Sequence, residues 1–262
     1  MSEIIPAATI LLLRDEPDFE VLMIERHADI GFAGGALVFP GGRMETSDGA
    51  QEWAGLCDGY DQTPPEERAP RVAAIREAFE EAGILYARKA GEAALISGAY
   101  AEELGVHRAA IENDDTLFRK LIEGEGLRLA CDALYLFARW MPPARVVHHR
   151  RYDTWFFAAK AAPGQRALED GNEATEAIWL TPQAALAARD EGTRKMIFPT
   201  SRNVELLTVR ETVDETLQFA ASRKIEKIEP TIVEEDGEAY LAIPDDQGYP
   251  ITRERITTAM RG

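Results

Sequence analysis

The nine residues from Arg76 to Ile84 constrain this chain more than any other segment. They read Arg-Glu-Ala-Phe-Glu-Glu-Ala-Gly-Ile, so a helix would place Glu77, Glu80 and Glu81 on one stripe. Like charges three or four residues apart destabilise an isolated helix. A hard divalent cation such as Mg²⁺ takes oxygen ligands and would neutralise the cluster while sharing it with substrate phosphates. The stripe therefore indicates a metal site, against the more ordinary alternative of a solvated acidic surface.

The flanking residues predict the helix that carries this stripe. Val72, Ile75 and Phe79 recur at helical spacing on the side opposite the carboxylates. We expect the helix to cover roughly 70–82 and to end at Gly83 in a left-handed cap. One face would then pack on the core, and the other could hold a metal.

Together with Phe39-Pro40-Gly41-Gly42 upstream, this segment resembles the Nudix box. That pattern is Gly, five residues, an acid, seven residues, then Arg-Glu-apolar-any-Glu-Glu-any-Gly-apolar. Residues 76–84 match each fixed position, and Gly42 and Asp48 match the left half, with Asp in place of the usual Glu. Residues 49–75 number 27 where the pattern has seven, so we expect an inserted loop at about 49–69 before the helix.

The resemblance implies an α+β fold in which a mixed β-sheet lies between helices as an α/β/α sandwich. We assign residues 1–224 to a Nudix hydrolase domain with a helical insertion at about 86–130, and residues 225–262 to a C-terminal extension. Within the extension, Asp236-Gly237 between two strand-like runs predicts a β-hairpin. We expect this extension to pack on the body of the domain or on the second subunit of a homodimer.

Other apolar runs bounded by turn residues predict the strands and helices of this frame. Strands are expected at 8–13, 21–24, 36–39, 134–141, 154–159 and 176–180. Thr181 is the expected N-cap of a helix that runs through Ala188. A single long amphipathic helix is expected over 201–223.

The resemblance also implies the roles of the box residues. Glu80, Glu81 and the carbonyl of Gly41 would bind Mg²⁺ or Mn²⁺. Glu77 would bind a second metal or orient the first shell. Arg76 would hold the glutamates through charge-assisted hydrogen bonds.

The general base is not fixed by the motif. Related enzymes often take it from a loop that precedes a late strand, the region that Glu173 and Glu176 occupy here. Each of these could equally be a surface acid in so acidic a chain. Asp48 is a third candidate, although it adjoins the inserted loop.

Over residues 5–210 the chain is similar to the coenzyme A diphosphatase branch of the family. Arg26 keeps the register of that branch's coenzyme A signature, but His27 takes a small-residue position and Gly31 takes the place of a second Arg. A missing guanidinium removes a bidentate phosphate partner. In the basic stretch at 148–151, Arg151 is the expected phosphate or adenine contact, unless the stretch is a solvated strand edge.

These resemblances imply metal-dependent hydrolysis of a nucleoside diphosphate linked to another group. Coenzyme A or acyl-coenzyme A is the leading substrate, and ADP-ribose or a dinucleotide is the alternative, because the box does not read the leaving group. A silent nucleotide-binding sensor is the second alternative, which the intact Glu77, Glu80 and Glu81 argue against. Hydrolysis of a substrate panel with and without Mg²⁺ would separate all three.

Composition limits the partners and the compartment. The net charge of −17, from 46 acidic and 29 basic residues, repels a phosphate backbone and disfavours nucleic acid. Two cysteines form no disulfide framework and fit a reducing compartment. The beginning of the chain lacks a basic signal-peptide region, its apolar run at 7–13 is too short for a membrane span, and its end is no peroxisomal address. We therefore expect a cytoplasmic protein with a small-molecule substrate and no membrane.

Overall fold

A computed structural model describes residues 3–28, 33–144, 150–169, 171–172 and 174–259. Its centre is a mixed sheet in the order β10-β7-β8-β1-β2-β3, with β4 paired to β1 and β9 paired to β2. These strands are β1 (Glu3–Arg14), β2 (Glu20–Arg26), β3 (Leu37–Val38), β4 (Gly41–Arg43), β7 (Tyr135–Trp140), β8 (Arg150–Lys160), β9 (Ala174–Leu180) and β10 (Lys227–Ile228). The predicted α+β fold is confirmed.

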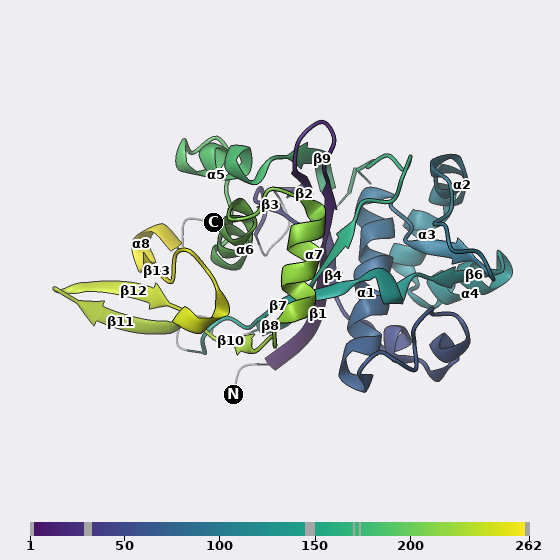
Figure 1. Cartoon of the computed structure of the whole chain (residues 1–262), viewed down its shortest axis with the longest axis horizontal. Coiled ribbons are helices and arrows are strands. Elements are labelled where there is room, and N and C mark those ends of the chain that lie inside the picture. The colour runs from purple at the N-terminus through teal and green to yellow at the C-terminus, as the bar shows by residue number, and fades with distance from the viewer. Residues whose placement is uncertain (1–2, 29–32, 145–149, 170, 173, 260–262) are drawn as a thin grey trace.

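Helices cover both faces of the sheet (Figure 1). The helix α1 (Pro65–Ala82) lies on one face, and α6 (Phe198–Thr208) and α7 (Val213–Ser222) lie on the other; α5 (Pro182–Asp190) adjoins α6. The alternation along β1 explains the two layers, because Ile10 and Leu12 pack in the core with α1, whereas Leu11 and Leu13 pack in the core with α6 and α7. Strand β1 is buried on both faces, as expected of a strand that pairs in parallel with β8.

The helix α1 differs from the prediction at its beginning. It begins at Pro65, a favoured first position, and not near residue 70, because its polar first turn precedes the apolar repeat from which the start was predicted. Its end agrees with the prediction: Gly83 is left-handed with φ 68°, and its N–H donates to the Phe79 carbonyl at 3.0 Å. All residues of 72–82 are buried, including the carboxylates on the face opposite the apolar repeat.

The predicted inserted loop is shorter and more ordered than expected. It holds two 3₁₀ helices, Thr46–Gly49 and Gln51–Gly55, before α1 begins. Trp53 anchors it by donating to the Ser47 carbonyl at 2.9 Å and by packing on Phe118, with ring centroids 5.8 Å apart. The loop therefore packs on the helical insertion that follows α1.

The helical insertion contains α2 (Gly98–Leu104), α3 (Arg108–Asn113) and α4 (Thr116–Gly124), as predicted. It also contains an unpredicted antiparallel pair, β5 (Ala87–Lys89) with β6 (Leu127–Leu129). Three-residue strands are too short to show a periodic pattern, so the sequence gives little signal for them.

The single helix expected over 201–223 is two helices, α6 and α7. The Thr212 hydroxyl accepts the Glu215 N–H at 3.2 Å, and the Glu215 carboxylate accepts the Glu211 N–H at 2.9 Å. This capping arrangement begins a new helix at Val213. Its Thr-x-x-Glu sequence was present but was read as part of one amphipathic run.

The C-terminal extension packs on the body of the protein. Its predicted hairpin joins β11 (Thr231–Glu235) to β12 (Glu238–Ala242) through Asp236 and Gly237, both at positive φ, and β13 (Arg253–Arg255) adds a third strand before α8 (Ile256–Ala259). Strand β10 extends the main sheet beside β7. Leu241 and Tyr249 are buried in the same core cluster as Trp140.

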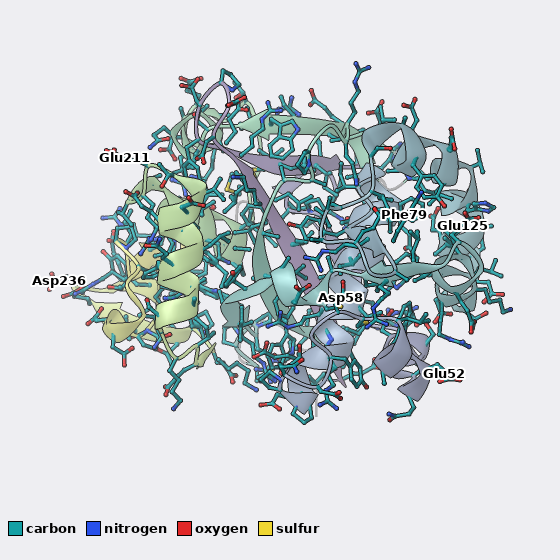
Figure 2. All side chains as sticks on the ribbon, turned by 45° about the vertical axis from the view of Figure 1, so that its right-hand side comes forward. Glu52, Asp58, Phe79, Glu125, Glu211 and Asp236 are labelled. Atoms are coloured by element: carbon teal, nitrogen blue, oxygen red, sulfur yellow. The ribbon has the colours of Figure 1, made fainter. Side chains whose placement is uncertain are left out.

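Charged side chains gather at the periphery of the molecule. Figure 2 shows Glu52, Glu125 and Asp236 at its outer edges, and each is exposed. The two cysteines, Cys57 and Cys131, are buried free thiols. Among the described helices, none is both long and apolar enough to cross a bilayer.

Candidate active site

A cavity of about 820 Å³ joins the box residues to the opposite face of the sheet. Its wall on the α1 side includes Gly41, Gly42, Arg43, Glu45, Arg76, Glu77 and Glu80. The insertion contributes Ile111, Glu112, Asn113 and Asp115. The sheet and α6 contribute Ala7, Thr9, Arg26, Trp140, Arg150, Tyr152, Thr154, Phe156, Ile197, Pro199 and Thr200. The insertion thus forms one wall of the cavity.

Arg76 is the centre of the carboxylate cluster. Its Nε and Nη2 donate to the two oxygens of Asp48, each at 3.0 Å. Its Nη1 donates to Glu77 at 2.8 Å and to Glu80 at 3.2 Å, and Nη2 also donates to the Arg43 carbonyl at 2.9 Å. Because each of these acidic side chains is buried, Arg76 fixes their positions, as the box resemblance implied.

Asp48 is held in this cluster despite the long insertion between the two halves of the box. One of its oxygens also accepts the Glu45 N–H at 2.8 Å, and the residue is 2% exposed. Both oxygens are therefore engaged within the protein. This arrangement fits a residue that positions Arg76 and does not support the earlier candidacy of Asp48 as the general base.

Two of the glutamates hold protons more tightly than usual. Burial, together with the charges of Glu80 and Asp48, raises the pKa of Glu77 to about 8, although Arg76 opposes the shift. Burial and neighbouring carboxylates, including Glu112, likewise raise the pKa of Glu80 to about 7. The cluster has more negative charge than Arg76 alone neutralises, so it favours a further cation.

Glu81 faces the strand β4. Its Oε2 accepts the Gly41 N–H at 2.7 Å, and its Oε1 lies 3.7 Å from Nη1 of Arg26. A Cβ atom at Gly41 would lie 2.4 Å from the Thr9 hydroxyl oxygen, and one at Gly42 would lie 2.6 Å from the Glu77 carboxylate. Gly41 therefore allows β4 to lie close to β1, and Gly42 allows it to approach the Glu77 carboxylate.

The donor set fits a hard divalent cation. Within the described part of the chain, no three His, Cys, Asp or Glu side chains surround a common point as they stand, since Glu77 and Glu80 contact Arg76 and Glu81 contacts Gly41. All the candidate ligands are nevertheless carboxylate or carbonyl oxygens, which Mg²⁺ and Mn²⁺ prefer. A bound cation would have to compete with these internal hydrogen bonds.

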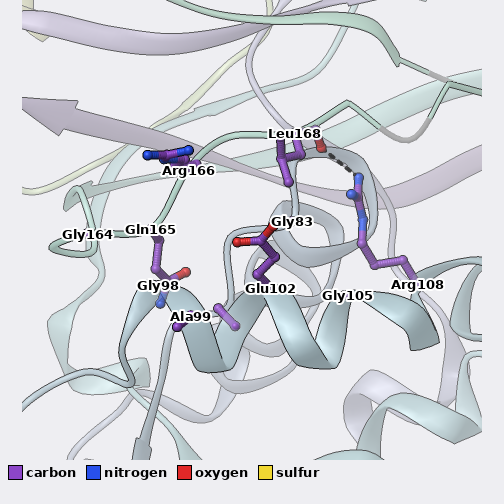
Figure 3. Close-up of a pocket in the computed structure, with 11 residues that line it drawn as sticks. Gly83, Gly98, Ala99, Glu102, Gly105, Arg108, Gly164, Gln165, Arg166 and Leu168 are labelled. Atoms are coloured by element: carbon purple, nitrogen blue, oxygen red, sulfur yellow. Dashed lines mark hydrogen bonds between the residues drawn. The ribbon is translucent and has the colours of Figure 1, made fainter.

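Arg108 ties the insertion to the carboxyl end of α1. Its Nε and Nη2 donate to the Glu80 carbonyl at 3.0 and 2.8 Å, and Nη2 also donates to the Leu168 carbonyl at 2.9 Å (Figure 3). The carbonyls of a last helical turn lack intrahelical partners, so Arg108 satisfies one of them. A second cavity of about 320 Å³ lies beside this contact, next to Gly98 and Gln165.

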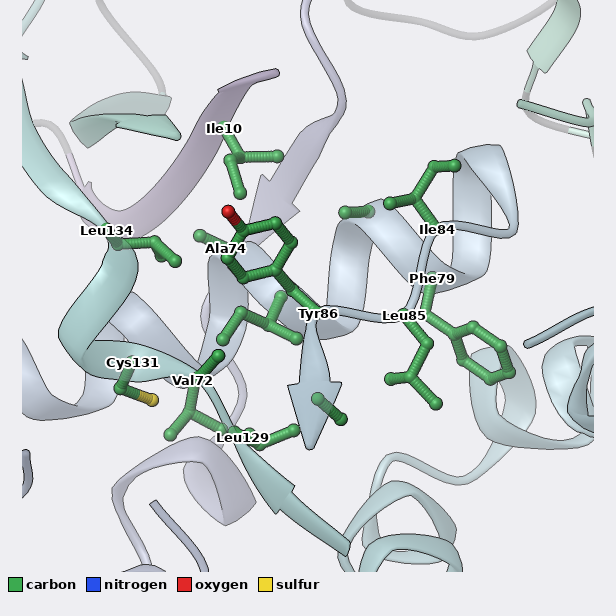
Figure 4. Packing of buried hydrophobic residues seen from close by; sticks show 14 of the residues in the cluster. Ile10, Val72, Ala74, Phe79, Ile84, Leu85, Tyr86, Leu129, Cys131 and Leu134 are labelled. Atoms are coloured by element: carbon green, nitrogen blue, oxygen red, sulfur yellow. The ribbon is translucent and has the colours of Figure 1, made fainter. Parts of the chain in front are cut away.

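The apolar side of α1 fixes the helix from beneath. Val72, Ala74 and Phe79 are fully or almost fully buried among residues of β1 and the insertion, including Ile10 and Leu129 (Figure 4). Full burial of a side chain the size of Val72 or Phe79 contributes about 1.5–3 kcal/mol. This packing sets the register of the carboxylates on the same helix.

The structure does not bring Glu176 to the cavity. It lies on β9 opposite Glu25 of β2, and its carboxylate accepts Nη2 of Arg194 at 2.6 Å. Glu173, the other residue proposed as base from the sequence, lies outside the described residues.

The structure corrects the expectation that Arg151 contacts a ligand. Its Nε donates to the Pro142 carbonyl at 2.7 Å and its Nη2 pairs with Glu229, so its guanidinium joins β8 to the segment after β10. Arg150, the preceding residue, lines the cavity instead. Adjacent strand residues point to opposite faces, and the sequence does not show which one faces a ligand.

The sequence reading missed the acidic residues of the insertion. Glu112 and Asp115 line the cavity with Glu80, although they belong to no recognisable motif. Only the way α3 packs on α1 brings them there, through the Arg108 contact described above.

Comparisons with known proteins agree with this geometry. The family model described as the NUDT19 Nudix domain matches residues 58–207. Acyl-coenzyme A diphosphatase NUDT19 from Xenopus laevis is 28% identical over 276 residues, covering 89% of this chain and 72% of that protein. The human protein of the same name is 25% identical over 272 residues, covering 88% and 72%. A crystal structure of a Nudix hydrolase from Alicyclobacillus acidocaldarius shares the fold, with a TM-score of 0.68, 24% identity and coverage of 83% of this chain and 97% of that chain.

Proposed function

The chain belongs to the Nudix hydrolase family described by the NUDT19 Nudix domain, and from this premise we propose that it hydrolyses the diphosphate of coenzyme A or acyl-coenzyme A. The observation that carries the proposal is the alignment of 89% of the chain with a relative named acyl-coenzyme A diphosphatase. The cavity of about 820 Å³ that holds Glu77 and Glu80 supports it, because it is of the size found for ligand sites.

Nudix hydrolases generally use divalent metal ions, and we propose Mg²⁺ or Mn²⁺ here. Glu77, Glu80, Glu81 and the Gly41 carbonyl are the proposed ligands. When bound, the cation would supply neutralisation of the diphosphate charge and a lower pKa for the attacking water. Arg76 and Asp48 hold the glutamates in place for this role.

We assign the general base to Glu112. It lines the cavity, and its charge contributes to the raised pKa of Glu80, so the two carboxylates are near each other. Glu176 is engaged by Arg194 and does not line the cavity. In this role Glu112 would accept the proton of the water that attacks phosphorus.

Three arginines in the cavity wall are the proposed contacts for the anionic substrate. Arg26 retains the position of the coenzyme A signature, and Arg43 and Arg150 line the same cavity. They offer positive charge on a chain whose net charge is −17. Arg150 would therefore supply the charge that the coenzyme A signature lacks in this sequence.

A substrate panel tests the proposal. Coenzyme A, acetyl-coenzyme A, ADP-ribose and a dinucleoside diphosphate are incubated with the protein in Mg²⁺ or in chelator, and products are separated by chromatography. We expect hydrolysis of the two coenzyme A species, lost in chelator. Faster hydrolysis of ADP-ribose or of the dinucleotide would identify the alternative substrate class. Binding without hydrolysis of any of them would identify a sensor.

A further inference from the structure

The amino end of α6 opens into the same cavity as the carboxylate cluster. Its N-cap residue Ile197 and the helical residues Pro199 and Thr200 line the cavity. Ile197 has no side-chain acceptor with which to cap the helix, and the Ser201 N–H is bonded to the Ile197 carbonyl at 3.0 Å. Pro199 has no N–H, and the N–H groups of Phe198 and Thr200 have no intrahelical acceptor, so this end carries a partial positive charge.

Thr200 adds a second, independent observation. The residue is 3% exposed, yet it lines the cavity, and no hydrogen bond joins its hydroxyl to any residue that the structure describes. Among the described residues the fully buried, unpartnered side-chain atoms do not include the Thr200 oxygen, so this oxygen reaches the open space of the cavity. A hydroxyl buried at the cavity wall with an open donor is suited to a ligand oxygen.

Cationic side chains in the wall strengthen the same preference. Arg26 lines the cavity, and its buried Nε has no acceptor among the described residues. The Arg26 N–H donates to the Ala36 carbonyl at 3.0 Å, and the next residue, Leu37, donates its N–H to the Lys195 carbonyl at 2.8 Å. These bonds place the segment that leads into α6 beside the end of β2.

The acidic groups of the cavity belong to different elements. Glu77 and Glu80 are on α1, Glu45 follows β4, and Glu112 and Asp115 are in the insertion. The floor between these walls and α6 is formed by β1, β7 and β8, with Thr9, Trp140 and Phe156. The carboxylates thus lie on α1, after β4 and in the insertion, whereas the amino end of α6 contributes Ile197, Pro199 and Thr200 and no carboxylate to the cavity.

We propose that the amino end of α6, with the Thr200 hydroxyl and the Arg150 guanidinium, binds a phosphomonoester of the substrate that is separate from the diphosphate being cleaved. The substrate class is then a nucleoside diphosphate ester with an additional ribose phosphate. This inference rests on the proposed function and deepens it. Coenzyme A carries such a 3′-phosphate, whereas dephospho-coenzyme A, ADP-ribose and simple dinucleotides do not.

The test compares kcat/KM for coenzyme A with that for dephospho-coenzyme A. Wild type is expected to favour coenzyme A, and Thr200→Val is expected to reduce that ratio about tenfold, the effect of losing one hydrogen bond to a charged group. Thr200→Ser, which keeps the hydroxyl, is expected to retain the ratio. Thr208→Val, at the other end of α6, is the matched control, because its hydroxyl donates to the Glu205 carbonyl.

A second pair of variants tests the charge. Arg150→Gln is expected to lower the ratio about threefold, less at high salt, because this side chain is exposed. Arg253→Gln on the hairpin is the control, since Arg253 is an exposed arginine paired with Glu235 outside the cavity. Unfolding midpoints of all variants show whether each one is folded.

A binding measurement separates this inference from the proposed function. Adenosine 3′,5′-bisphosphate is expected to bind more tightly than AMP by calorimetry, with the difference reduced by Thr200→Val. If wild type cleaves neither coenzyme A species, the proposed function is wrong. In that case the difference in binding between the two nucleotides alone shows whether the phosphate subsite exists. Equal catalytic loss on both substrates in Thr200→Val would place the helix end at the scissile diphosphate and overturn the inference. Equal binding of the two nucleotides would also overturn it.

Discussion

The Arg76 guanidinium donates to both carboxylate oxygens of Asp48 at 3.0 Å, across 28 residues of sequence. The long insertion between the two halves of the box therefore leaves their contact intact. The separate helical insertion that follows the box packs on α1, the helix that carries Arg76, and lines the cavity, so it belongs to the site and is not a remote appendage.

Asp48→Asn is expected to destabilise the protein by about 2 kcal/mol, because one of two charge-assisted bonds to a buried guanidinium is lost. Urea unfolding measures this loss. Asp58→Asn is the control: Asp58 also pairs with two arginines, but its side chain is 27% exposed, so the expected change is under about 1 kcal/mol. Equal losses in the two variants would show that burial of the Asp48 contact adds nothing.

Glu80→Gln and Glu81→Gln are each expected to lower kcat by at least about a hundredfold, because each removes a proposed metal ligand. The fold should remain, and the melting point of Glu80→Gln in chelator should hold or rise, since a buried charge is removed. Mg²⁺ should stabilise wild type more than either variant. Glu123→Gln, on the exposed part of α4, is the control. If the variants keep wild-type, Mg²⁺-dependent rates, these residues are not metal ligands.

The stability of the metal-free protein should fall as pH rises from 6 to 9. The pKa values of Glu77 and Glu80 are raised from 4.5 to about 8 and about 7, so the folded protein binds these protons more tightly than the unfolded chain. Their stabilising contribution is full below about pH 4.5 and is lost as pH passes through 7 and 8. Melting points in chelator measure the slope, which should flatten in a Glu77→Gln, Glu80→Gln double variant. An unchanged slope in that variant would contradict the assignment.

Metal binding should show the opposite pH dependence. Protons and the cation compete for the same carboxylates, so the apparent affinity for Mg²⁺ should rise from pH 6 to 9. The Mg²⁺-induced shift in melting point follows this affinity at each pH. If the Mg²⁺-induced shift in melting point is constant with pH, the metal does not bind these two glutamates.

Glu112→Gln is expected to lower kcat by about 10²–10⁴-fold with a small change in KM, the effect of removing a general base. Glu176→Gln serves as the comparison, because its carboxylate is bound to Arg194 away from the cavity. If Glu176→Gln shows the large effect instead, the base assignment from the structure is wrong.

Strong local signals made part of this site predictable. Gly42, Asp48 and the run 76–84 form a spaced pattern in which each residue type has a distinct physical task. The hairpin at Asp236-Gly237 was predictable for the same reason, since both residues adopt the positive φ that this turn requires.

The remaining features depend on tertiary packing. Arg150 and Arg151 differ only in the strand face that they occupy, which β-strand pairing decides. Glu112 enters the cavity because Arg108 holds the insertion against the Glu80 carbonyl. The sequence Thr212-x-x-Glu215 is typical of the start of a new helix and so indicates the break between α6 and α7. Because the amphipathic pattern continues on both sides of it, a single helix was expected.

The most direct test of the central claim is hydrolysis of coenzyme A in Mg²⁺ and ¹⁸O-labelled water, with mass spectrometry of the products. Water attack on phosphorus at this site predicts phosphopantetheine and adenosine 3′,5′-bisphosphate, with one ¹⁸O atom in a phosphate of one of them. Glu80→Gln should slow the formation of both products by at least about a hundredfold. Intact coenzyme A, or products without label in phosphate, would contradict the account.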